Sequence, residues 1–187
     1  SVVVKYNAQN DKLLINPTIF TNSSIVANNT INITNHGFKT GQKLFYDGSP
    51  ATGLTSQRSY FVYKTDDSNF KLAETRYDVI NEPPKVVNFT ANTGGTQELS
   101  LVNPPLEIVR NDNLLFYVSD PSLNGYEFNF FFDRHFKNRF VSAGSTTDFG
   151  VIGVGTVGVG TTSTITLKFD ESNPEKIFYT LEKTGFI

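Results

Sequence analysis

The chain has 187 residues (20.8 kDa), 13% of them aromatic and 18% charged, and this aromatic content excludes a disordered chain, which cannot build an apolar core. Sixteen Lys and Arg against 18 Asp and Glu give a net charge of −2, which predicts no affinity for nucleic acid or an anionic membrane, and no apolar run approaches the roughly 18 residues of a membrane span. The absence of cysteine excludes disulfides, thiolate nucleophiles, Cys-type zinc sites and a blue-copper thiolate.

Residues 1–19 are expected to form a linker or an incoming strand. The chain starts at Ser1 and contains no methionine, which favours a segment of a larger polypeptide. Short stretches rich in β-branched and aromatic residues, bounded by turn residues, then predict strands at residues 31–34, 43–46, 60–64, 70–73 and 98–102. Residues 86–89 are predicted to pair with residues 98–102 as a hairpin. Together these elements predict a small β domain at residues 20–103, which ends at a Pro-Pro pair that cannot enter a central strand.

Several turns of this domain follow one another in a regular order. Asn35-His36-Gly37 leads to a Thr40-Gly41 turn, a strand, the Gly53-Leu54 loop, the Tyr-rich residues 60–64 and the apolar-Lys-Leu-Ala residues 70–73. This order resembles a β-rich repeat of structural proteins in tailed bacteriophages, including marine cyanophages, and of some large bacterial surface proteins. The resemblance covers about 40 residues and implies a virion structural protein. In the repeat, His36 corresponds to a turn residue and not to a metal ligand.

The remaining residues, 104–187, are predicted to form a second β domain. Residues 113–130 contain strand and turn signals, residues 165–169 alternate apolar and polar side chains, and residues 176–181 supply a further strand. Residues 131–141 carry five apolar side chains and could form one or two helical turns. Residues 150–161 repeat Gly, Val and Thr, which favours a long hairpin or loop whose valines touch a neighbouring surface and not a phosphate-binding loop, because no Lys-Ser/Thr pair follows.

Residues 105–108, 113–130 and 177–186 resemble the two ends of a cupredoxin-like domain. The resemblance implies a Greek-key β-sandwich and places four residues at the copper-ligand positions. Tyr126 stands at the first His, Thr180 at the Cys, Lys183 at the second His and Phe186 at the axial Met. Blue copper requires a thiolate and imidazoles, so the resemblance predicts the fold without the metal, and no cofactor is expected.

A small basic cluster lies within the second domain, made of Arg134, His135, Phe136, Lys137 and Arg139. One interpretation is binding of an acidic partner surface or nucleic acid through stacking and charge. The other is an amphipathic connection with phenylalanines toward the core and charges toward water. The pairs Asp66-Asp67 and Asp170-Glu171 lack the spacing of a calcium loop and are interpreted as solvated turns.

The sequence therefore predicts an all-β protein of two small tandem domains. We expect a non-enzymatic structural segment of a phage virion protein, such as a tail sheath, baseplate or fibre, which packs against other virion subunits or copies of itself. The alternative is a binding module that recognises a host-surface glycan or a partner protein through its aromatic-rich surface. An enzyme is not expected, because two histidines and no cysteine leave few pairs of nucleophile and base.

Overall fold

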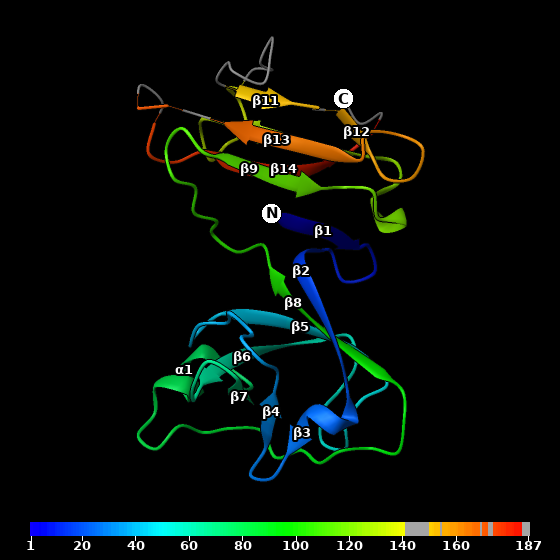
Figure 1. Ribbon diagram of the computed structural model, residues 1–187, viewed down its shortest axis with the longest axis vertical. Coiled ribbons are helices and arrows are strands. Elements are labelled where there is room, and N and C mark those ends of the chain that lie inside the picture. The colour runs from blue at the N-terminus through cyan, green and yellow to red at the C-terminus, as the bar shows by residue number, and fades with distance from the viewer. Residues whose placement is uncertain (141–149, 154, 169, 172–173, 185–187) are drawn as a thin grey trace. The chain divides into compact units, whose positions relative to one another are not determined.

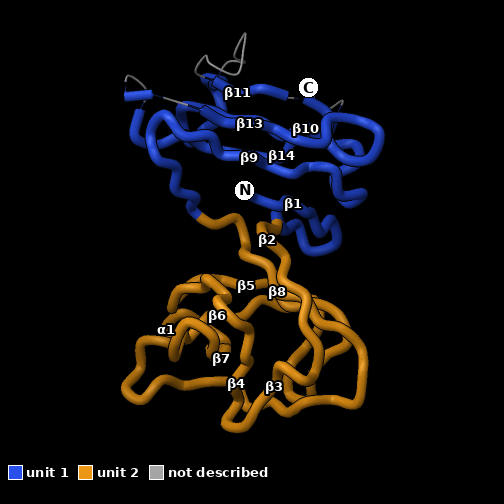
Figure 2. Tube along the Cα trace, in the orientation of Figure 1, with its two compact units in different colours: residues 1–13, 105–187 blue, residues 14–104 orange. Residues whose placement is uncertain are grey.

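The computed structural model describes residues 1–140, 150–153, 155–168, 170–171 and 174–184, and these form two compact units (Figures 1 and 2). One unit consists of Leu14–Pro104, and the other joins Ser1–Leu13 to Pro105–Ile187. In both units almost all of the regular secondary structure is β-strand, so the all-β prediction is confirmed. Residues 1–19, predicted to form a linker or an incoming strand, contain strand β1 (Val2–Asn7) and most of strand β2 (Lys12–Thr21).

The Leu14–Pro104 unit contains one antiparallel sheet in the order β2-β8-β5-β6-β7-β4-β3. The strands predicted at residues 31–34, 43–46, 60–64, 70–73 and 98–102 are present, with ends that differ from the prediction by at most two residues. A five-residue helix, α1 (Arg76–Ile80), follows β7, and a 3-10 helix (Asn22–Ser24) follows β2. The strands are β2 (Lys12–Thr21), β3 (Ile25–Val26), β4 (Thr30–Asn32), β5 (Lys43–Gly48), β6 (Arg58–Lys64), β7 (Asn69–Ala73) and β8 (Thr96–Val102).

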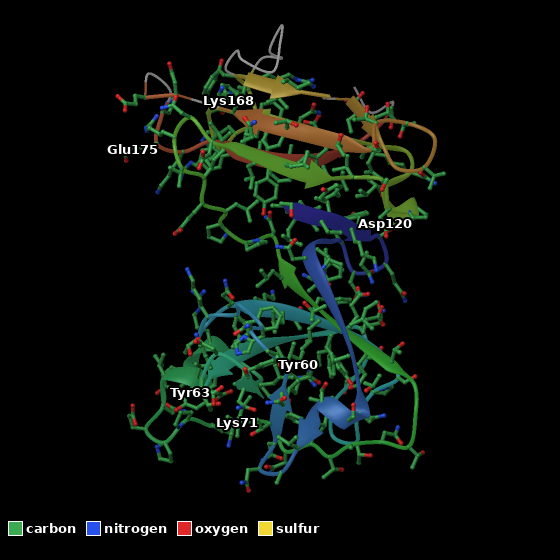
Figure 3. The ribbon with its side chains drawn as sticks, in the orientation of Figure 1. Tyr60, Tyr63, Lys71, Asp120, Lys168 and Glu175 are labelled. Carbon is green, nitrogen blue, oxygen red and sulfur yellow. The ribbon has the colours of Figure 1, made fainter. Side chains whose placement is uncertain are left out.

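Alternation along these strands builds the core of the unit. Leu44 and Tyr46 of β5 and Tyr60 and Val62 of β6 are at most 1% exposed, because side chains two positions apart lie on the same face of a strand. Tyr63 lies on the other face of β6 and is partly exposed (Figure 3). The alternation of apolar side chains therefore sets which face of the sheet is buried.

The prediction of a hairpin between residues 86–89 and 98–102 is wrong. Residues 86–89 form no strand; the Val87 N–H donates to the carbonyl oxygen of Leu72 at 2.8 Å, and Thr90 forms a bridge with Thr52. Strand β8 pairs with β2 on one side and with β5 on the other. Both edges of β8 are thus occupied by strands that lie far from it in the sequence.

The other unit contains two sheets that pack face to face. One has the order β11-β13-β9-β1, in which β1 and β9 (Asn113–Tyr117) run parallel, and the other has the order β12-β10-β14. The ring of Phe116 in the first sheet lies 5.4 Å from Phe128 and 5.3 Å from Phe130 in the second. These contacts make the unit a β-sandwich. Its other strands are β10 (Tyr126–Phe131), β11 (Gly150–Ile152), β12 (Gly155–Val157), β13 (Thr164–Lys168) and β14 (Phe178–Lys183).

The Gly- and Val-rich residues 150–161 do not form the single hairpin or loop that their composition favours. Strand β11 pairs with β13 in one sheet, and β12 pairs with β10 in the other. Val151 and Val157 are both fully buried, one in each sheet. This segment therefore crosses between the sheets of the sandwich and supplies core side chains to both.

Candidate functional site

The predicted basic cluster lies on one loop of the sandwich, residues 132–140, here called the basic loop. It leaves the end of β10 and folds back beside it, since the Phe132 N–H donates to the Asn138 carbonyl at 2.8 Å and the Phe140 N–H to the Phe130 carbonyl at 2.9 Å. The helical turns that the sequence suggested for residues 131–141 are absent from the described residues of that range, 131–140. The basic loop is a compact loop whose end pairs with the end of β10 through a bridge between Phe131 and Arg139.

The Asp133 carboxylate holds this turn together. It accepts hydrogen bonds from the backbone N–H groups of His135 at 3.0 Å, Lys137 at 3.1 Å and Asn138 at 2.7 Å. These bonds, that of Asn138 above all, hold the pKa of the Asp133 carboxyl below its usual range. Asp side chains compete in this way with helix formation, which explains the absence of the suggested helical turns.

Phe136 stands at the tip of the basic loop in an unusual conformation. Its φ is 56°, in the left-handed region that bulky residues rarely enter, and the residue is 44% exposed. Its ring packs edge-on against buried Phe131, with 5.3 Å between the centroids. The amphipathic interpretation, with phenylalanines toward the core, describes the 5%-exposed Phe140 and does not describe Phe136. Strain of this kind is found most often where a side chain has a function.

Arg139 differs from the other basic residues of the cluster. Its guanidinium lies 5.6 Å above the ring of Phe131 and 3.5 Å from the Glu182 carboxylate on β14. The same carboxylate accepts a hydrogen bond from Asn129 Nδ2 at 2.8 Å, and Asn129 is 2% exposed. Arg139 therefore packs on the outer face of the β12-β10-β14 sheet.

Arg134, His135 and Lys137 are exposed and form the outward part of the cluster. The Arg134 Nε–H lies 3.4 Å from His135 Nε2, so the two side chains lie together. The predicted cluster thus divides into a packing part, Arg139, and an outward part at residues 134–137.

The positions that correspond to copper ligands do not converge in the described residues. Tyr126 pairs directly with Lys183 across β10 and β14, whereas Thr180 pairs with Asn129. Because side chains alternate along a strand, Thr180 lies on the opposite face of the sheet from Lys183. Phe186 lies outside the described residues. Within the described ranges there is also no group of three or more His, Asp or Glu side chains that could hold a metal ion.

His36 has the contacts of a turn residue. Its Nδ1 accepts the Phe38 N–H at 2.9 Å, and its Nε2 lies 3.0 Å from the carbonyl oxygen of Asp66. The side chains of the Asp66-Asp67 pair are likewise used within their own turn, since the Asp66 carboxylate accepts the Ser68 N–H at 2.8 Å and Asp67 pairs with Lys64 at 2.7 Å. Hydrogen bonds from Asn69 to Asp66 and from Lys64 to Asp67 hold the pKa values of both carboxyls below their usual range.

The Leu14–Pro104 unit contains a buried polar network that the sequence did not predict. The Tyr46 hydroxyl donates to Gln97 Oε1 and accepts the Ala51 N–H at 2.8 Å. Gln97 Nε2 in turn donates to Asn22 Oδ1 at 3.0 Å, and Asn22 Oδ1 also accepts the Asn92 N–H at 3.0 Å. No local pattern marks this network, because its members are separated by up to 75 residues.

No helix in the described residues is long and apolar enough to cross a membrane. No protein-family model, curated protein or solved structure matches this chain.

Proposed function

We propose that this chain is a non-enzymatic structural segment of a tailed-phage virion protein, such as a tail sheath, baseplate or fibre. Its two β units act as packing or decoration domains against other virion subunits or copies of the same chain. The proposal takes its phage assignment from the repeat-like order of turns and strands around His36. The β-sandwich arrangement of the second unit is compatible with the proposed cupredoxin-like architecture without copper.

One observation supports the structural role: side chains of the types that act in catalysis are engaged in hydrogen bonds that stabilise the fold. His36 bridges two turns, Tyr46 lies at the centre of a buried network, and Asp133 binds the backbone of its own loop. Within the described residues, every buried side-chain nitrogen and oxygen atom has a hydrogen-bond partner. Complete internal satisfaction of this kind favours a rigid scaffold.

The test uses particles of a phage whose genome encodes this sequence. Particles purified by density gradient are analysed by peptide mass spectrometry, and an antibody raised against residues 1–187 is used for immunogold electron microscopy. We expect peptides of the chain in the particle fraction and gold at a repeated position on the tail. Peptides found only in the particle-free lysate would contradict the proposal.

A second function, a binding module for a host-surface glycan or a partner protein, is favoured by the outward part of the basic loop. Phe136 is half-exposed in a strained conformation, and the cationic residues Arg134 and Lys137 lie on either side of it in the sequence. Contact with Phe131 packs part of the Phe136 ring but leaves the residue 44% exposed, and an exposed aromatic side chain in a strained conformation is typical of a binding surface.

A further inference from the structure

We propose that residues 134–137 of the basic loop bind an acidic pyranose, that is, a sugar ring that carries a carboxylate. The inference names the ligand class of the second function above, but it concerns the isolated chain and does not depend on a virion location. It is carried by three properties of the loop: its hydrogen-bonding groups, its fixed aromatic ring and its small size.

The outward side chains of the loop are rich in hydrogen-bond donors. Arg134 has five N–H donors and Lys137 has three, and both residues are exposed. The one carboxylate of the turn, Asp133, is engaged by three backbone N–H groups. A ligand at this surface must therefore supply acceptors, and a carboxylate is the acceptor whose shape fits the planar guanidinium of Arg134.

Phe136 lies between Arg134 and Lys137 in the loop sequence and supplies an apolar surface. Its edge-on contact with Phe131 at 5.3 Å fixes the ring, and the hydrogen bond from the Phe136 N–H to the Asp133 carbonyl at 3.2 Å fixes its backbone. The faces of a pyranose ring present C–H groups, which pack favourably on the electron-rich face of an aromatic ring. A fixed ring loses little conformational entropy when a ligand stacks on it.

The size of the surface favours a sugar over a protein. A stable protein interface buries about 800 Å² on each partner, usually with 20 or more residues. Four consecutive residues, one of them aromatic, fit one or two sugar rings. Binding at a single loop is expected to be weak, and repeated copies in an assembly would increase the overall affinity without new contacts.

The test measures binding of tetragalacturonate to the recombinant chain of residues 1–187 by ¹H–¹⁵N chemical-shift titration at low salt. Its fully methyl-esterified form has the same rings without the charges and serves as the neutral ligand. A hexaglutamate peptide represents an acidic protein segment. We expect tetragalacturonate to shift the amides of residues 134–138, the ester to bind at least tenfold more weakly, and hexaglutamate to bind more weakly than the sugar.

Two variants and one control locate the site. Arg134→Gln/Lys137→Gln removes the cations and should lower the affinity at least tenfold. Phe136→Asn keeps a residue that tolerates positive φ but removes the ring, so the affinity should fall about two- to tenfold while the loop folds. Lys39→Gln/Lys85→Gln removes the same number of charges from exposed positions of the Leu14–Pro104 unit and should leave the affinity within twofold.

Circular dichroism and the amide shifts of residues outside the loop establish that each variant is folded. Absence of binding at 10 mM tetragalacturonate would overturn the proposal, as would equal binding of the ester or equal loss in the control variant. Stronger binding of hexaglutamate would assign the loop to an acidic protein partner and would also overturn it. None of these outcomes bears on the virion location, which the particle analysis tests separately.

Discussion

The buried hydroxyl of Tyr46 provides the sharpest test of the fold. Tyr46 is 0% exposed, and Ala51 and Gln97 on either side of its hydroxyl are each 1% exposed. Tyr46→Phe removes one oxygen and leaves both the Ala51 N–H and Gln97 Oε1 without this partner inside the core. Each buried polar group left unsatisfied costs about 1–3 kcal/mol, so we expect a loss of about 2–6 kcal/mol for the two groups. That is a large part of the about 5–15 kcal/mol that stabilises a typical domain.

The same substitution at two tyrosines of β6 gives a graded control. The Tyr60 hydroxyl accepts a single N–H, that of Thr55 at 2.9 Å, so Tyr60→Phe should cost about 1 kcal/mol. Tyr63 lies on the opposite, partly exposed face of the strand, and Tyr63→Phe should change stability by less than about 0.5 kcal/mol. The three substitutions remove the same atom, so any difference among them reflects the environment of the hydroxyl.

Urea unfolding followed by circular dichroism measures the stability of each variant, and amide hydrogen exchange at Ala51 reports on the Leu14–Pro104 unit alone. This second measurement matters because two compact units can unfold in separate steps. A Tyr46→Phe variant no less stable than Tyr63→Phe, with unchanged exchange at Ala51, would refute the role assigned to the network.

Three further predictions concern pH and backbone conformation. Burial raises the pKa of Tyr46 and Tyr179, and the hydrogen bond to Asp11 raises the pKa of Tyr6. The neutral phenols therefore stabilise the fold fully below about pH 10, and this stabilisation is lost as the pH rises through the folded-state pKa values. Absorbance at 295 nm should show these three of the eight tyrosines ionising at higher pH in the folded chain than in the unfolded chain. The pKa of Asp133 is lowered in the folded chain, so its ionised carboxylate stabilises the fold above about pH 4 and this stabilisation is lost as the pH falls. Asp133→Asn should flatten the pH dependence of stability between about pH 4 and pH 2 and speed hydrogen exchange of the basic-loop amides. An unchanged acid transition would count against this prediction. Gly53 and Gly37 both have positive φ, but only at Gly53 would a new Cβ overlap a neighbouring atom, the Asn88 carbonyl oxygen. Gly53→Ala should therefore lower the free energy of unfolding in urea more than Gly37→Ala does. Equal losses, near the about 1 kcal/mol that the backbone conformation costs, would show that the site relaxes.

The basic loop illustrates how much of the candidate site the sequence can predict. The residue types and their spacing identified the cluster and its exposed charges. They did not separate Arg139, which pairs with Glu182 43 positions away and packs on the sheet, from the outward residues 134–137. They also did not predict the left-handed Phe136, because the Asp133 turn that enforces it depends on several backbone groups at once.

Local properties determined the all-β class and most strand positions. Alternation and β-branched or aromatic residues act within a few positions, so β5 and β6 could be placed from residues 43–46 and 60–64 alone. Tertiary structure decided which strands pair. Strand β1 joins β9, more than 100 residues away, β8 excludes residues 86–89 as a partner, and residues 150–161 divide between two sheets. Distant segments compete for burial and for free strand edges as the chain folds, so the outcome depends on the whole chain and cannot be read from one segment.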